Sequence, residues 1–462
     1  MTSALGSASP LATGPTLDHS IRRAHGFEPL RLEGQLPRGL RGTLYRTGPG
    51  LLQRFGRPVA HPFDADGAVT AIRLGDGAAA GATVVVASKE YDEEERAGRF
   101  LYGTSASRLR QVYNNLTGHK KSTGNTNLLW WQDRLFALME NARPQELDPA
   151  TLGSLGTTDL GVVRDGFSAH PHRVAALSTT FNFGIRGKHI DLFALPDHGA
   201  PRLLGSFEAP WISMVHDFIA TDKHLVFVIG PAKLITWRAM FAVGDLSQYF
   251  RWDPDAGAMV VVVPLACPER VTRFLVDTFW VWHFVNAFED GDSIAVELCR
   301  HDTFSAFAAP SSAGPEHGQP QYYRFRLDPR RELFEGTPLW SDPAEFPSVD
   351  PRRAGARQRF TFLQTFPAAQ KAPGVARFDC ESGEVQAWAA PSTHLGVEPV
   401  FVPGGGDEEG AGWILQLFQD PAAGRSYLAV LDAEHLAAPP LARIWMPEAV
   451  PMTFHGVFVK AP

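Results

Sequence analysis

The amino-acid sequence predicts an all-β protein, and three observations support this prediction. Short runs rich in β-branched residues recur along the chain, turn residues separate them, and convincing helices are few. Such runs include Leu225–Ile229 (LVFVI), Met259–Val263 (MVVVV) and Tyr427–Leu431 (YLAVL). Many hairpins in one long chain fit a β-sandwich, a barrel or a propeller.

Turns that begin with aspartate separate the predicted strands. Examples are Asp148-Pro149, Asp328-Pro329 and the run that starts at Asp379 (DCESG). Aspartate accepts hydrogen bonds from the backbone of a turn, proline fixes φ, and glycine adopts a positive φ. The most distinct predicted helix is residues 232–249 (AKLITWRAMFAVGDLSQY), an apolar and aromatic segment.

Charge and cysteine content narrow the functional class. The chain has 462 residues, a formal net charge of −7 and three cysteines. An acidic balance argues against a nucleic-acid binder, which needs a basic face to neutralise phosphates. The cysteines form no CxxC pair and are too few for a disulfide scaffold. We therefore expect free thiols and a cytoplasmic protein.

We expect one domain over residues 17–462, preceded by a disordered lead at residues 1–16. The lead (MTSALGSASPLATGPT) is small and polar, and it lacks the basic start and apolar run of a signal peptide. No apolar stretch reaches the roughly 18 residues that a membrane-spanning helix needs. No linker of domain scale interrupts the remainder, and the sequence indicates no obligate protein partner.

Four of the sixteen histidines lie among apolar or small residues near predicted strand ends: His170, His216, His283 and His455. A neutral imidazole is a good ligand for iron, zinc or copper. The spacings of 46, 67 and 172 residues follow no local metal motif, so ordinary core histidines are the alternative. A propeller would let these residues converge, because each blade contributes its innermost strand to one axis.

The chain resembles the carotenoid cleavage oxygenases, and among them the apocarotenoid oxygenases of cyanobacterial type. The resemblance runs from about Pro29 to the C-terminus. Its motifs, in order, are GTLYRTGPG (42–50), HPFDADG (61–67), GRFLYG (98–103), NTN (125–127), ALME (137–140), ELDP (146–149) and the four histidine segments. Thr47, Ala65 and Asn127 depart from the usual pattern, and none of these departures removes a proposed ligand.

The resemblance implies a seven-bladed β-propeller with helices and loops forming a cap over the active-site face. It also implies that the four histidines bind one Fe(II) and that O2 is a co-substrate. Three glutamates match positions that hold the histidines in the family: Glu140, Glu345 and Glu398. A carboxylate that accepts the outer imidazole N–H fixes the tautomer and aims the ring at the metal. We pair the glutamates, in chain order, with His216, His283 and His455.

The implied reaction is cleavage of a carbon–carbon double bond in an apocarotenoid, an apocarotenal or apocarotenol, to give two carbonyl products, retinal-like aldehydes among them. No side chain need act as general acid or base, because the protein holds the metal, excludes water and positions the bond. Candidate residues for the substrate and O2 pocket are Thr126, Trp282, Phe284, Phe63, Phe167 and Trp211. Backbone hydrogen bonding by Thr126, and core packing by the aromatic residues, are the alternatives.

Three other functions fit the same fold: stilbene cleavage to two aromatic aldehydes, polyene isomerisation, and non-enzymatic binding. Stilbene-cleaving relatives bind a phenol through a lysine and a tyrosine. Lys121 occupies the corresponding position, but apocarotenoid-type members also have a lysine there, so this residue does not discriminate.

Carotenoid-type substrates reside in membranes, so the protein needs access to them. Residues 232–249 combine Trp237, Met240 and Phe241 with Lys233 and Arg238. Such a segment can lie in the interface of a bilayer as a peripheral contact. The alternative is a cap helix that packs on the propeller.

Overall fold

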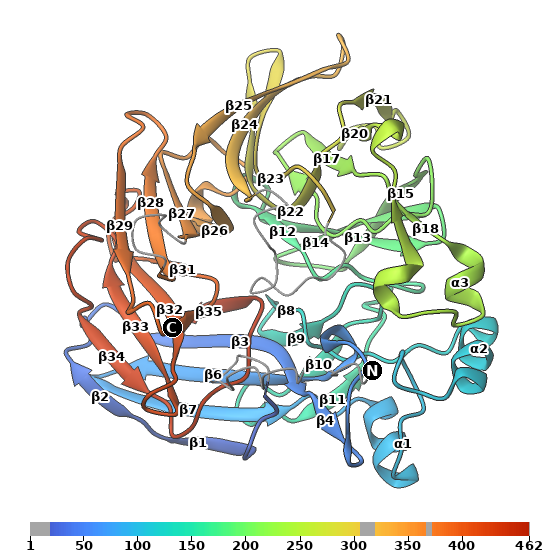
Figure 1. Ribbon diagram of the computed structural model, residues 1–462. Helices are drawn as coiled ribbons and strands as arrows, with labels where there is room; N and C mark the ends of the chain where they lie inside the picture. The colour runs from blue at the N-terminus through green and yellow to red at the C-terminus, as the bar shows by residue number, and fades with distance from the viewer. Residues whose placement is uncertain (1–18, 305–318, 366–371, 462) are drawn as a thin grey trace, which may run out of the picture.

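The computed structural model describes residues 19–304, 319–365 and 372–461. Over these ranges, seven sheets of four to six strands are arranged around a common centre (Figure 1). This arrangement confirms the predicted all-β, seven-bladed propeller. The disordered lead expected at residues 1–16 lies outside the described residues.

Each blade is one antiparallel sheet in which the strands pair one after another. In the first blade the order is β35 (Gly456–Lys460), β3 (Gly42–Leu51), β6 (Asp66–Gly75), β7 (Ala78–Val85) and β1 (His25–Pro29). The second has β8 (Asn127–Trp131), β9 (Arg134–Leu138), β10 (Gln145–Leu147) and β11 (Ser154–Thr157). The third has β12 (His172–Val174), β13 (Thr179–Arg186), β14 (His189–Pro196) and β15 (Arg202–Glu208).

The fourth blade has β16 (Ile219–Ala220), β17 (His224–Ile229), β20 (Ala258–Pro264) and β21 (Thr272–Val276). The fifth has β22 (Trp280–Asp290), β23 (Ser293–His301), β24 (Gln321–Asp328) and β25 (Leu333–Trp340). The sixth has β26 (Ala344–Val349), β27 (Phe360–Thr365), β28 (Gly374–Asp379) and β29 (Val385–Ala389). In the seventh, β30 (Leu395–Gly396) and β31 (Val400–Pro403) both pair with β32 (Gly412–Asp420), followed by β33 (Arg425–Asp432), β34 (Ala442–Trp445) and β2 (Arg31–Gly34).

Two strands from distant parts of the chain close the ring. The late strand β35 pairs with β3 of the first blade, with Tyr45 opposite Val457. The early strand β2 pairs with β34 of the seventh blade, with Leu32 opposite Ile444. Each end of the ring is therefore completed by residues from the other end of the sequence.

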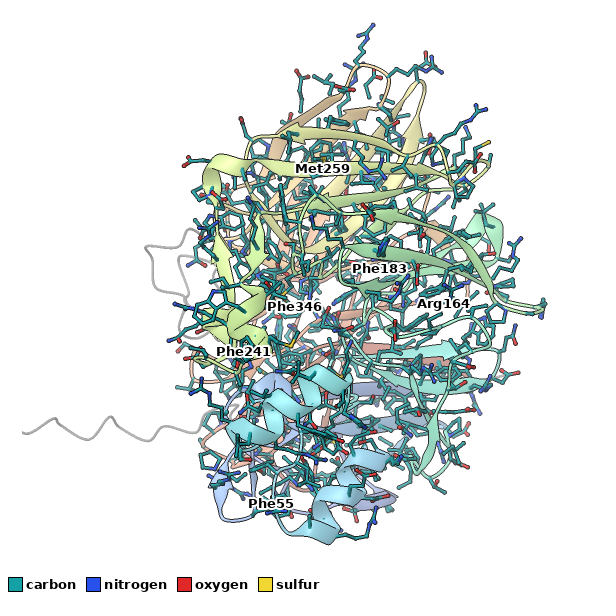
Figure 2. The ribbon with its side chains drawn as sticks, turned by 90° about the vertical axis from the view of Figure 1, so that its right-hand side faces the viewer. Phe55, Arg164, Phe183, Phe241, Met259 and Phe346 are labelled. Carbon is teal, nitrogen blue, oxygen red and sulfur yellow. The ribbon has the colours of Figure 1, made fainter. Side chains whose placement is uncertain are left out.

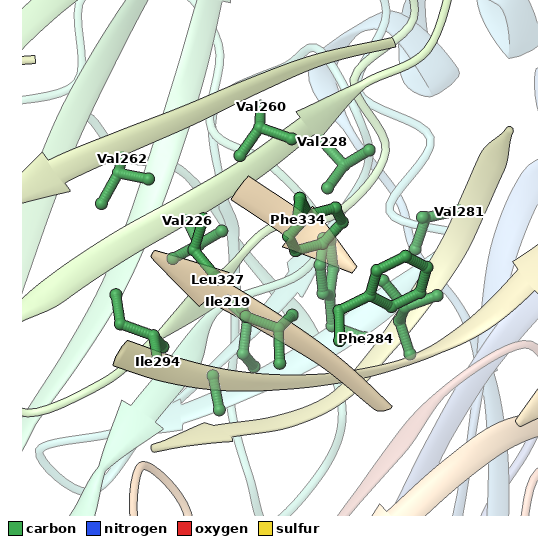
Figure 3. Close-up of a cluster of buried hydrophobic side chains, with 14 of the residues drawn as sticks. Ile219, Val226, Val228, Val260, Val262, Val281, Phe284, Ile294, Leu327 and Phe334 are labelled. Carbon is green, nitrogen blue, oxygen red and sulfur yellow. The ribbon is translucent and has the colours of Figure 1, made fainter. Parts of the chain in front are cut away.

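Adjacent blades bury both faces of the sheet between them. In β17, Val226 and Val228 pack toward the fifth blade, whereas Leu225, Phe227 and Ile229 pack toward the third. Figure 3 shows the first of these interfaces, in which valines of the fourth blade meet Phe284, Ile294 and Phe334 of the fifth. A strand buried on both faces has a continuous apolar run rather than an alternating one. The run LVFVI forms most of β17, which is such a strand.

The predicted turns are present where aspartate begins them. The Oδ1 atom of Asp148 accepts hydrogen bonds from the backbone N–H groups of Ala150 and Thr151, at 2.8 and 2.9 Å. Asp328 and Asp379 accept in the same way from the residues two and three positions later. Aspartate thus satisfies the backbone donors that the turn leaves without a ladder partner.

The prediction of one helix over residues 232–249 is wrong. The segment begins as β18 (Ala232–Leu234), which pairs with β19 (Phe250–Trp252), and only α3 (Thr236–Met240) is α-helical. Ala242 and Gly244 adopt positive φ values of 51° and 99°, which end the helix. A 3-10 turn, η3 (Leu246–Tyr249), then leads into β19.

Three short α-helices lie together at one margin of the propeller: α1 (Lys89–Ala97), α2 (Arg108–Thr117) and α3 (Figures 1 and 2). The remaining regular elements are the ribbon of β4 (Gln53–Arg54) and β5 (Arg57–Pro58) and the 3-10 turns η1 (Pro62–Asp64), η2 (Ala175–Leu177), η4 (Pro254–Ala256) and η6 (Pro351–Arg353). Among the described residues, no helix has both the length and the apolarity to cross a bilayer. All three cysteines are free thiols.

We expect the packing between blades to dominate stability. Phe227 is fully buried and its ring contacts those of Phe183, Phe207 and Phe218. The substitution Phe227→Ala should lower the free energy of unfolding by about 3–5 kcal/mol, because it removes a large apolar side chain and leaves a cavity. Guanidinium unfolding followed by tryptophan fluorescence measures this. Phe241→Ala, at a ring that is 52% exposed, is the matched control and should change little.

Candidate metal centre

Four strands next to the propeller axis each bring one histidine to the centre. His170 precedes β12, His216 precedes β16, His283 lies in β22, and His455 immediately precedes β35. Each of these strands is at the edge of its sheet, and Figure 1 shows β12, β22 and β35 nearer the middle than the strands at the opposite edges. Residues that are far apart in the sequence therefore meet.

The four imidazoles form a compact and buried cluster. One ring nitrogen of each lies within 4.8 Å of the others, and each residue is at most 8% exposed. The centroids of five of the six ring pairs are between 4.2 Å, for His170 and His216, and 5.4 Å, for His170 and His283. Nitrogens bound to one ion at about 2.1 Å each would lie roughly 3–4 Å apart, so the cluster has the size of a metal site.

The ring nitrogens also have the chemistry of metal ligands. The Nε2 atoms of His170 and His283 are buried and have no hydrogen-bond partner among the described residues. A buried polar atom without a partner is costly, and a metal ion in the centre would satisfy both. Four neutral nitrogens and no thiolate suit iron, copper, nickel or zinc.

Carboxylates lie behind three of the four rings. His283 Nδ1 is 2.5 Å from Glu345 Oε2, and His455 Nδ1 is 2.7 Å from Glu398 Oε1. His216 Nδ1 is 2.8 Å from Glu140 Oε1. An ionised carboxylate only accepts hydrogen bonds, so the Nδ1 atoms of His283 and His455 carry the proton and their Nε2 atoms keep a lone pair for the centre. The His216 and Glu140 atoms are close, but their contact lacks the geometry of a hydrogen bond.

These contacts join each glutamate to the histidine with which the sequence paired it. Glu140 is also 3.8 Å from His170 Nε2, which is too long for a hydrogen bond. His170 is therefore the ligand candidate whose ring has no carboxylate of its own among these three glutamates.

Burial favours the neutral form of two of the four rings, whereas at His283 the nearby Glu345 outweighs burial and raises the pKa. Burial, followed by the proximity of His216, His455 and His283, lowers the pKa of His170 well below the ordinary value for histidine. Burial also lowers the pKa of His455, although Glu398 opposes this effect. A ring with a lowered pKa is deprotonated at neutral pH and can donate its lone pair to a metal.

A buried arginine fixes the segment before His455. Arg46 of β3 is 1% exposed. Its Nε donates to Thr453 Oγ1 at 2.8 Å, and its Nη2 donates to the carbonyl oxygen of Phe454 at 2.9 Å. Nη1 donates to the backbone oxygen of Glu398 and lies 3.4 Å from its carboxylate. A divalent ion in the centre and Arg46 would together balance the charges of the three glutamates.

Local backbone distortions aim two groups at the centre. The pairing of β22 with β23 is irregular on both sides of Phe284, and such a bulge re-orients the neighbouring His283. Phe346, next to Glu345, has a φ of 48°, which is uncommon for a bulky residue. Its ring centroid is 4.8 Å from that of His283 and 5.5 Å from that of His455.

Among the predicted pocket residues, Trp282 and Phe63 lie next to the cluster. The Trp282 ring meets His216 edge-on, with centroids 4.8 Å apart. Phe63 contacts Phe454, the neighbour of His455, at 5.5 Å. Both rings are partly exposed, so both are accessible to a small molecule.

The structure places Phe284 and Phe167 in core clusters between the blades, and contact of either residue with a substrate stays a prediction. Phe284 packs in the core between the fourth and fifth blades (Figure 3). Phe167 is fully buried in a separate core cluster, where its ring stacks on Phe193. Both side chains fill the space between sheets.

The other two pocket candidates have different surroundings. Thr126 Oγ1 donates to Asn125 Oδ1 at 3.1 Å, and Thr126 N donates to the carbonyl oxygen of Leu138. Trp211 stacks under the ammonium group of Lys233, 4.6 Å from the ring centroid. Contact of Thr126 or Trp211 with a substrate stays a prediction.

Sequence analysis did not single out Phe346, His301 or Phe304 as site residues. His301 Nε2 is 2.8 Å from Glu345 Oε1, so Glu345 contacts two histidines. Phe304 is 5.8 Å from the ring of Trp282. Only Phe346 gave a signal that could have been used, since it follows directly after Glu345 in the sequence.

Comparisons with known proteins agree with this geometry. The family model described as RPE65, retinal pigment epithelial membrane protein, matches residues 20–460. The apocarotenoid-15,15'-oxygenase of Synechocystis sp. is 32% identical, over 93% of this chain and 92% of its own length. The isoeugenol monooxygenase of Pseudomonas nitroreducens is 27% identical, over 94% of this chain and 95% of its own length.

A solved structure has the same fold. A threonine-to-alanine variant of Synechocystis apocarotenoid oxygenase superimposes with a TM-score of 0.88 and 28% sequence identity. The match covers 96% of this chain and 98% of that chain.

We expect His283→Ala to lose both the metal and the activity, because it removes one of four ligands. Removing a residue that supports a metal ligand commonly lowers metal affinity or activity by about 10- to 100-fold. Removing the ligand itself should therefore lower both by more than about 100-fold. Metal content by mass spectrometry and aldehyde formation are the measurements. His394→Ala is the control, because this histidine contacts Tyr427 in the seventh blade and should retain both. Full turnover by His283→Ala would contradict the assignment.

Proposed function

Because this chain belongs to the carotenoid cleavage oxygenase family, we propose that it is an Fe(II)-dependent dioxygenase that cleaves one double bond of an apocarotenoid. Both atoms of O2 enter the products, which are two carbonyl compounds, one of them retinal-like. The observation that carries the proposal is the four-histidine cluster, with its nitrogens within 4.8 Å of one another.

Ferrous iron in this site would supply the redox chemistry that activates O2 toward a carbon–carbon double bond. The residues of the chain bind, orient and exclude water. The four histidines would hold the ion, while Glu345 and Glu398 fix the tautomers of His283 and His455 and Glu140 lies 2.8 Å from His216 Nδ1. Trp282 and Phe346 provide apolar surfaces next to the rings of His216 and His283. No proton donor is needed, since neither product requires a proton from the protein.

The aromatic residues near the centre suit a long conjugated substrate. Trp282 continues into a cluster of rings with Trp280 and Phe304, at 5.1 and 5.8 Å. This cluster extends to Phe250 and Trp252 of β19, which is paired with β18 next to α3. Apolar and aromatic walls favour a rigid polyene, which has few groups that hydrogen-bond.

The surroundings of Lys121 favour a polyene over a stilbene. Its ammonium nitrogen lies 2.6 Å from Asp66 and 2.7 Å from Glu94, and its side chain is 6% exposed. Arg54 contacts the same two carboxylates. A phenol could bind this lysine only by breaking a buried ion pair, and such a break commonly costs about 3–5 kcal/mol.

Exposed apolar residues on α2 and α3 support delivery of the substrate from a membrane. They are Leu109, Tyr113 and Leu116 on α2 and Trp237, Met240 and Phe241 on α3, and each is at least 38% exposed. The positions on α2 lie four and three residues apart, on one face of the helix. Asn115 donates to the carbonyl oxygen of Ala239 at 2.7 Å, which joins the two helices. Figure 2 shows Phe241 on this side of the molecule.

The substrate class can be decided with a panel of compounds. The Fe(II)-loaded protein should convert apocarotenals or apocarotenols to two carbonyl fragments, detected by mass spectrometry, and 18O2 should label both fragments. It should give little aromatic aldehyde from stilbenes. Aromatic aldehydes as the main products would favour stilbene cleavage. A cis/trans change without fragments would favour isomerisation, and either result would replace the proposal.

Membrane contact predicts a specific effect of charge on α3. The double variant Trp237→Glu/Phe241→Glu should float with anionic or neutral liposomes much less than the parent, because charges do not enter the apolar part of the interface. Leu203→Glu/Leu275→Glu is the matched control, since both leucines are exposed on blade strands, β15 and β21, at 39% and 57%. Equal flotation of the α3 variant and the parent would remove the membrane proposal.

A further inference from the structure

We propose that Asp217 is a positioning residue that fixes three of the four histidine segments relative to one another. The inference rests on the proposed metal centre but not on the proposed substrate. Asp217 follows His216 in the sequence and is 4% exposed. Its hydrogen bonds within the described ranges reach none of the four imidazoles, so any role at the centre has to act through the backbone.

The carboxylate of Asp217 connects three neighbouring blades. Its Oδ1 accepts from Phe218 N at 2.7 Å, in its own segment. The same oxygen is 2.7 Å from His172 Nε2 at the start of β12. Its Oδ2 accepts from Phe284 N of β22 at 2.8 Å. The three partners are therefore within two residues of His216, His170 and His283, respectively.

The position of these strands explains why a side chain is needed. Strands β12, β16 and β22 are each at the edge of a sheet, next to the axis. The side of such a strand that faces the axis has no neighbouring strand to pair with. The backbone N–H of Phe284 points away from the paired strand β23. It donates a hydrogen bond to the carboxylate of Asp217, which belongs to the adjacent blade. Without this contact, the bulged part of β22 that carries His283 would lose a buried hydrogen bond.

His170 depends most on this arrangement. Its ring has no hydrogen bond to Glu140, which contacts His216 instead. Its segment is held from one side by Asn127, whose Nδ2 donates to the carbonyl oxygen of Ala169 at 2.7 Å. From the other side it is held by His172, through Asp217. The ligand without its own carboxylate is thus positioned through its neighbours.

The chemistry of an ionised carboxylate suits this role better than that of an amide. Asp217 receives two backbone N–H groups and faces the imidazole nitrogen of His172. An asparagine oxygen can accept from one side, but its NH2 group would face the opposing donors. Asp217→Asn therefore keeps the shape of the residue and breaks at least one of the three contacts.

Metal release tests the proposal without using turnover. The parent and the variants are loaded with Co(II), and the rate of transfer to a chelator is followed together with the ligand-field spectrum of the cobalt. We expect Asp217→Asn to release the ion about 10- to 100-fold faster than the parent and to shift the spectrum, because the ligands are less well ordered. Unfolding of the metal-free proteins is measured in parallel.

A second pair of variants covers the case in which Asp217→Asn does not fold. His172 lines a cavity of about 310 Å³ bordered by the inner strands, so leucine and glutamine fit there. His172→Leu removes the donor and should release the ion faster. His172→Gln restores an N–H donor and should behave like the parent.

The outcomes separate this proposal from the proposed function. If the Asp217→Asn and His172→Leu variants unfold more easily without metal but release cobalt at the parent rate, Asp217 is only structural and the proposal is overturned. If release is accelerated as expected while no substrate of the panel is cleaved by the iron-loaded parent, the positioning role stands and the proposed function fails.

Discussion

The burial of both faces of every blade is the constraint on which the rest of the structure depends. A sheet such as β16–β17–β20–β21 has apolar side chains on both faces, so it is stable only between two other sheets. A series of such sheets has no free face once it closes into a ring, and closure places the innermost strands around one axis. The convergence of His170, His216, His283 and His455 follows from this packing.

Closure brings the imidazoles together, but their protonation state and direction depend on buried charges. A group of neutral rings with inward lone pairs is unfavourable without a cation, and a cation in a dry interior is unfavourable without anions. Glu140, Glu345 and Glu398 supply three negative charges. A divalent ion would offset two of them, and the guanidinium group of Arg46 offsets the third. Two of the same carboxylates, Glu345 and Glu398, also hold the Nδ1 protons of His283 and His455. Charge balance and ligand orientation therefore come from the same residues.

The sequence predicted the features that depend on local or regular patterns. Runs such as LVFVI and MVVVV indicate strands buried on both sides, and Asp148 indicates a turn. The apolar surroundings of the four histidines marked them as candidates, but their convergence and the three glutamates were accessible only through the resemblance to a family, because their spacing reflects the path of the chain around a ring. No periodicity in the sequence reports which residues face the axis.

Two further features of the structure have physical causes that a single sequence does not report. Trp282 and Phe284 flank His283 equally in the sequence, and a regular strand would put both on one face. The bulge in β22 separates them, so that Trp282 contacts His216 and Phe284 packs in the core. Residues 232–249 have the composition of a helix, but Ala232–Leu234 pairs with a strand 16 residues further on. Long-range pairing overrides local preference in both cases.

The location of His455 has a consequence for how this molecule ages and is degraded. This residue immediately precedes β35, the strand that closes the first blade. Capture of an ion by His455 and the docking of that strand are thermodynamically coupled, since a ligand that binds only the closed form stabilises it. A cell short of the metal would therefore hold molecules in which β35 detaches more readily. Proteases that require an unfolded segment would begin there, and the supply of metal would set the lifetime of the protein.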